Sequence, residues 1–141
     1  MPSVQENFVV PKEHAQIILR CVPLSFISGL YALWMDQPLM VTSIPFLITC
    51  SSVLYWSHPT YSWRRNVDIG TVIYCASYQA YRALYADNSL YYFIFKFLGI
   101  LSYFVGRYTD RHNPYMGVVC HTGIHIFTNI GNIILYSGKI D

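Results

Sequence analysis

Long apolar segments, one directly after another, constrain the fold of this chain more than any other feature. A helix needs about 20 apolar residues to cross a hydrocarbon core about 30 Å thick. Segments of roughly this length lie at 15–34, 39–56, 67–86, 89–106 and 115–136. Because they consume nearly the whole chain, we expect an all-α, polytopic transmembrane bundle of about five spans. The bundle forms a single domain over 15–136, preceded by a polar segment, 1–14, and followed by a short tail, 137–141.

Composition supports a membrane protein. Hydrophobic residues make up 54% of the chain and charged residues only 11%, whereas about a quarter of a soluble domain is charged. The competing interpretation is a soluble helical bundle, since Arg20, Arg82 and Lys96 interrupt the apolar segments. That interpretation is disfavoured because no polar helices remain to cover five adjacent apolar ones.

The distribution of basic residues predicts an orientation in the membrane. The N-terminus lacks the basic region and cleavage site of a removable signal peptide, so the first helix is expected to stay as an anchor. With five spans, the two ends of the chain lie on opposite sides. The N-terminal side collects Lys12, Arg64, Arg65, Arg107 and Arg111. The other side has Lys139 and Arg82, so the positive-inside rule predicts an integral, multi-pass protein with a cytoplasmic N-terminus.

Several function classes find no support in the sequence. The four cysteines are isolated and form no CxxC pair, which is typical of small apolar core residues. No phosphate-binding loop, dinucleotide fingerprint or nucleophile elbow is present. The net charge of +2 is too small to indicate nucleic-acid binding. The partners that fit are the lipid bilayer, a lipid substrate or another membrane protein.

Two histidines stand out in the last apolar segment. His121 and His125 are four residues apart, so they lie on one side of a helix. At about 100° per residue, Thr128, Asn129 and Asn132 fall in the same sector. Within a membrane such a polar stripe must face protein, water or a metal.

Three interpretations of the histidine pair compete. Imidazoles at i and i+4 can bind one Zn²⁺ if another segment supplies a third ligand. Alternatively, the pair belongs to a structural network that holds helices together by hydrogen bonds. Haem ligation fits poorly, because neighbours on one helix cannot reach both faces of a haem. The first two interpretations remain open.

A second group of polar residues lies around the break between the second and third segments. Ser51 and Ser52 lie about one turn inside the second segment, and His58 follows it. Asp68 begins the third. His121 lies about 9 Å below the start of its own segment, on the same side of the membrane. We therefore expect these groups to share a leaflet, with Asp68 and the histidine stripe turned toward the bundle interior.

Two further features of the sequence lie outside these polar groups. Tyrosines recur at helical spacing in the third segment (Tyr74, Tyr78, Tyr81 and Tyr85), and we expect them to pack between helices. Lys96 lies in the middle of the fourth segment, where a lysine requires a partner or a wet cavity. A Schiff base at Lys96 is chemically possible, but nothing else in the sequence supports it.

The serine, histidine, aspartate and HxxxH pattern resembles the CREST membrane hydrolases, which include the alkaline ceramidases and relatives of the adiponectin receptors. The resemblance rests on residues in 51–70 and 115–132. It implies a Zn²⁺ held by His121, His125 and His58, with Asp68 and Ser52 serving the bound water. The chain also resembles small membrane proteins of giant viruses and protists, a likeness that implies no activity.

The sequence thus leads to two functional hypotheses. The favoured one is a non-catalytic membrane component or accessory subunit, because two adjacent histidines supply only part of a zinc site. The alternative is a zinc-dependent hydrolase of a lipid amide or ester. In that enzyme Asp68 orients or deprotonates the zinc-bound water and Ser52 binds the developing oxyanion.

Overall fold

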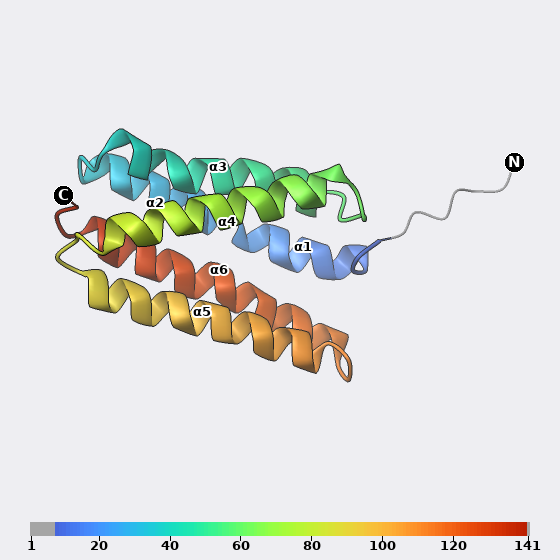
Figure 1. Ribbon diagram of the computed structural model, residues 1–141. Coiled ribbons are helices and arrows are strands. Elements are labelled where there is room, and N and C mark those ends of the chain that lie inside the picture. Colours follow the sequence, from blue (N-terminus) through green and yellow to red (C-terminus); the bar gives the residue numbers. More distant parts are fainter. Residues whose placement is uncertain (1–7, 141) are drawn as a thin grey trace, which may run out of the picture.

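The computed structural model describes residues 8–140, and their regular structure is almost entirely helical (Figure 1). The helices are α1 (Lys12–Cys21), α2 (Pro23–Trp34), α3 (Leu39–Trp56), α4 (Trp63–Ala83), α5 (Ser89–Thr109) and α6 (Pro114–Tyr136). The all-α bundle predicted from the sequence is confirmed.

The six helices form five rods, because α1 and α2 are joined at a proline and together make up the first rod. Pro23 is the first residue of α2 and has no N–H to donate, so it interrupts the hydrogen-bond ladder there. Val22 nevertheless keeps helical dihedral angles, φ −58° and ψ −37°. The chain therefore continues in the same direction, and α1 and α2 together form one apolar stretch over Lys12–Trp34.

Successive rods run in opposite directions (Figure 1). The connections α3–α4 and α5–α6 lie at the end of the bundle where α1 begins, which we call the N-terminal end. The connections α2–α3 and α4–α5 lie at the opposite end, beside residues 137–140. This arrangement places the starts of α4 and α6 at the same end of the bundle as the end of α3, as the shared-leaflet prediction requires.

Four stretches in the described part of the chain are long and apolar enough to cross a membrane: Lys12–Trp34, Leu39–Trp56, Ser89–Thr109 and Pro114–Tyr136. The segment 67–86, expected as the third of five spans, is a helix but does not belong to this set. Polar residues such as Asp68, Gln79 and Arg82 lower its mean hydropathy. It nevertheless lies alongside the other rods (Figure 1).

The outer surface of the bundle is rich in large apolar side chains. Phe97 and Phe104 on α5 are 64% and 63% exposed, and Leu39 at the start of α3 is 78% exposed. Side chains of this kind, distributed around the helices, are typical of a lipid-facing surface. They support a membrane location.

Short backbone contacts close both ends of the bundle. At the N-terminal end, Phe8 forms an isolated antiparallel bridge with Thr60. At the opposite end, Ala86 forms one with Ile140, whose side chain is buried. The expected tail 137–141 is therefore packed against the bundle as far as residue 140. Of the expected polar segment 1–14, residues 1–7 lie outside the described residues.

Candidate functional site

The histidine pair lies between three helices. The His121 ring, on α6, packs edge-on against Trp56 at the end of α3, with 5.2 Å between ring centroids. It also contacts Tyr103 on α5 at 5.8 Å and His125 at 5.8 Å. The pair thus faces protein, as the sequence predicted, and the neighbours of the His121 ring are aromatic.

Two polar atoms of the α6 stripe are buried without a hydrogen-bond partner among the described residues. They are Nε2 of His125 and Oδ1 of Asn132. A buried polar atom without a partner is uncommon, because it loses its bonds to water on folding. The hydrogen-bonding capacity of these two α6 atoms is therefore not met by other described side chains or backbone groups.

Asp68 lies on the same side of the bundle but bonds to α3, not to the histidines. Its Oδ1 accepts hydrogen bonds from the hydroxyls of Ser51 and Ser52, both at 2.9 Å. All three side chains are buried. The predicted proximity of Asp68 to the serines is confirmed, and the bonds join α4 to α3.

His58, the expected third zinc ligand, is not brought together with the histidine pair. It follows the end of α3 and packs against Phe8, with 5.2 Å between ring centroids. The side chain from this region that touches His121 is Trp56, whose indole offers no metal ligand. Within residues 8–140, no group of three or more His, Cys, Asp or Glu side chains is placed to hold a metal ion.

Asn129 connects α6 to α2 through two buried serines. The Asn129 side-chain oxygen accepts a hydrogen bond from Ser28 at 2.9 Å, and its amide nitrogen donates to Ser25 at 3.2 Å. The same nitrogen donates to the backbone oxygen of His125. Asn129 therefore has a structural role in joining two helices.

A third polar network joins α4, α5 and α6, and the sequence did not predict its pairing. The Gln79 amide nitrogen donates to the Tyr136 hydroxyl, and its oxygen accepts from the Lys96 ammonium at 3.2 Å. The ammonium also lies 5.0 Å from the centre of the Tyr92 ring. Lys96 thus has the partners that a mid-membrane lysine requires. Polar residues on facing helices were the available signal, but they do not specify which side chains meet.

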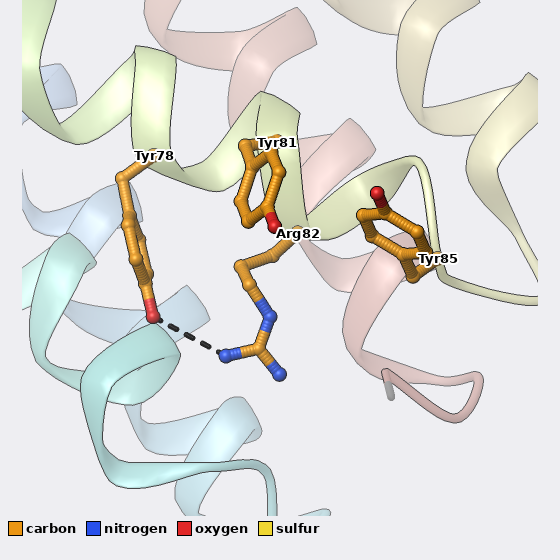
Figure 2. Close-up of a pocket in the computed structure, with 4 residues that line it drawn as sticks. All are labelled: Tyr78, Tyr81, Arg82 and Tyr85. Carbon is orange, nitrogen blue, oxygen red and sulfur yellow. Dashed lines mark hydrogen bonds between the residues drawn. The ribbon is translucent and has the colours of Figure 1, made fainter.

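Of the α4 tyrosines expected to pack between helices, only Tyr78 packs against the hydrophobic core. Tyr74, Tyr81 and Tyr85 are exposed on the outside of the bundle, and Tyr78 is half-buried. Tyr78, Tyr81 and Tyr85 line an open hollow together with Arg82 (Figure 2). A second hollow lies at the same end of the bundle, between the α2–α3 connection and residues 137–140. Neither is lined by the histidine pair or Asp68.

Comparison with protein-family models, with curated proteins and with solved structures finds no match to this chain.

Proposed function

We propose that this protein is a non-catalytic component of a membrane, a small multi-pass subunit whose interior polar side chains hold its helices together. One observation carries the proposal. The buried polar groups on different helices bond mainly to one another: Asp68 to Ser51 and Ser52, Asn129 to Ser25 and Ser28, and Gln79 to Tyr136 and Lys96. Such bonds stabilise helix association where lipid surrounds the bundle.

The charge distribution supports a cytoplasmic N-terminal end. Basic residues at this end include Lys12 at the start of α1, Arg64 at the start of α4 and Arg107 at the end of α5. Arg82 and Lys139 belong to the opposite end. Basic residues are retained preferentially on the cytoplasmic side. The low hydropathy of α4 is compatible with a fifth crossing because its polar side chains bond inside the bundle.

The alternative, a zinc-dependent lipid hydrolase, has one specific observation in its favour. Ser52 and Asp68, the pair that would serve a zinc-bound water, are hydrogen-bonded to each other. The ligands fit less well. His121 and His125 are adjacent, but His58 packs against Phe8, and no third metal ligand joins the pair among residues 8–140.

Elemental analysis of the purified full-length chain separates the two functions. The non-catalytic proposal predicts no stoichiometric zinc, and His121→Ala and His125→Ala should change only stability. One zinc per chain, lost in both histidine variants while Asn129→Ala retains it, would instead establish a metal site. Asn129→Ala is a suitable control because it alters the same helix without removing a metal ligand.

A further inference from the structure

A cluster of basic and aromatic side chains lies at the N-terminal end of the bundle, where the α3–α4 connection meets the start of α1 (Figure 1). We call it the basic patch, and its members are Lys12, Tyr61, Trp63, Arg64 and Arg65. The segments that supply it, 8–12 and 58–65, contain no acidic residue. Glu13, which follows Lys12, brings one negative charge against the three positive charges of the patch. The patch therefore carries an excess of positive charge.

Contacts between the two segments make the patch continuous. Phe8 forms a backbone bridge with Thr60, and the Val9 N–H donates to the Pro59 carbonyl oxygen at 2.8 Å. The Lys12 ammonium lies 5.0 Å from the centre of the Phe8 ring. These contacts hold Lys12 beside the α3–α4 connection, so its charge adds to those of the two arginines at the start of α4.

The two arginines are held by aromatic groups and not by carboxylates. Arg64 lies over the Trp63 ring at 5.8 Å, and Arg65 lies over the Tyr61 ring at 5.6 Å. Arg65 also interacts with the Tyr55 hydroxyl. Within residues 8–140, no hydrogen bond or ion pair occupies the Arg64 guanidinium. A contact with the face of a ring leaves the N–H groups of a guanidinium available to an anion.

The exposed aromatic rings indicate the depth of the patch in the membrane. Tyr61 and Trp63 are 69% and 62% exposed. They follow the end of α3, which is long and apolar enough to cross a membrane. Tyrosine and tryptophan at the ends of membrane spans lie at the level of the lipid headgroups. The anionic groups found at this level belong to phospholipids, and they are most abundant in the cytoplasmic leaflet.

We propose that the basic patch binds the headgroup of an anionic phospholipid. Arg64 donates hydrogen bonds to the phosphate oxygens, and Lys12 adds a second positive charge next to them. This inference rests on the membrane location and the cytoplasmic N-terminal end proposed above. It does not depend on whether the protein is a catalyst.

Native mass spectrometry of the full-length protein in detergent tests the proposal. The probes are phosphatidylserine and phosphatidylcholine with identical acyl chains. Both contain a phosphate, but only phosphatidylserine has a net negative charge, so wild type should bind it in preference. Arg64→Gln should weaken phosphatidylserine binding by about fivefold, the contribution of one basic side chain near an anionic membrane surface. Adding Lys12→Gln should weaken it by about fivefold again.

Arg111→Gln is the matched control. Arg111 is exposed in the α5–α6 connection, at the same end of the bundle but outside the basic patch. Its substitution removes the same charge and should change phosphatidylserine binding by less than about twofold, because salt screens exposed charges at a distance. Arg64→Lys keeps the charge and should retain most of the binding. Equal losses in Arg64→Gln and Arg111→Gln, or in Arg64→Gln and Arg64→Lys, would overturn the proposal.

A salt titration of wild type tests the proposal without any substitution. Raising the ammonium acetate concentration should release phosphatidylserine and leave phosphatidylcholine binding little changed, because salt screens charge–charge attraction. Salt-independent binding of phosphatidylserine would contradict recognition by the basic patch. Equal binding of the two lipids at low salt would also overturn it, and would favour an acidic protein segment as the partner of these cations. Zinc content is measured separately, so failure of either proposal leaves the other open to its own test.

Discussion

Gly106 on α5 and Gly117 on α6 bring the backbones of these two helices into direct contact. A Cβ atom added to Gly106 would lie 2.9 Å from the Gly117 carbonyl oxygen. A Cβ atom on Gly117 would lie 2.8 Å from the Cβ of Asp110, in the connection between the helices. Small residues permit such close approach between membrane helices. Because much of α5 is exposed, this contact contributes directly to holding the helix in place.

Gly106→Ala should therefore destabilise the bundle by about 1–3 kcal/mol, the usual cost of overpacking a close contact. The matched control is Gly70→Ala on α4, where an added Cβ meets nothing within 4 Å. The control should be neutral or stabilising by up to about 1 kcal/mol, because alanine is the better helix former. Thermal unfolding in detergent measures both. Equal stability of the two variants would show that the α5–α6 contact is looser than described.

The hydrogen bond between Ser52 and Asp68 should make a measurable contribution to the free energy of unfolding, which a double-mutant cycle can isolate. We expect Ser52→Ala to cost about 0.6 kcal/mol and at most about 1.7 kcal/mol, the range of interhelical hydrogen bonds in a membrane protein. Asp68→Ala should cost more, because it leaves both Ser51 and Ser52 without this acceptor. Once Asp68 is alanine, adding Ser52→Ala should have a smaller effect, since the bond is already lost.

Ser43→Ala is the control for the comparison of the Ser52→Ala and Asp68→Ala variants. Among residues 8–140, the Ser43 hydroxyl bonds only within its own helix, to the Met40 backbone oxygen, so its loss should be independent of Asp68. Strict additivity of Ser52→Ala with Asp68→Ala would mean that the two side chains do not interact in the membrane.

The sequence was sufficient to predict the arrangement of the rods and the proximity of one polar pair. Long apolar segments with short breaks require antiparallel neighbours, so the end of α3 and the start of α4 had to meet. Ser52 and Asp68 lie within about one to two turns of that connection, and their contact follows from chain geometry. The sequence therefore predicted at which end of the bundle this polar pair lies.

The rotation of each helix and the pairing of long side chains could not be predicted in the same way. The spacing of His121 and His125 places them on one face, but it does not specify that Trp56 would cover His121. His58 was expected near the pair. It follows the last residue of α3, however, and outside a helix its direction is not fixed by helical spacing, so the sequence did not reveal that it packs against Phe8. The tyrosines of α4 gave no sign of facing outward, because an aromatic ring suits both a helix interface and a membrane boundary.

Cysteine labelling tests whether α4 crosses the membrane. In a background without native cysteines, positions 61 and 85 flank α4, and position 110 lies in the α5–α6 connection. If all five rods cross, a membrane-impermeant reagent should label positions 61 and 110 from the same side and position 85 from the other. Labelling of 61 and 85 from one side would mean that α4 lies within the bundle without crossing. Opposite labelling of 61 and 110 would contradict the arrangement of the rods.

Because Lys96 is paired with Gln79, we expect a single substitution at Gln79 to be more destabilising than a double substitution at both residues. Gln79→Leu removes the acceptor of the Lys96 ammonium and leaves that charge with the Tyr92 ring. Because an unpaired buried polar group costs about 1–3 kcal/mol, and more if charged, this single variant should be strongly destabilised. Adding Lys96→Met removes the charge, so the double variant should be more stable than Gln79→Leu alone. Both variants lack the Gln79–Tyr136 bond, so its loss cancels in the comparison. Unfolding in detergent at neutral pH measures the difference. A double variant less stable than Gln79→Leu would show that Lys96 stabilises the bundle without Gln79, through its contact with Tyr92 or through its aliphatic stem.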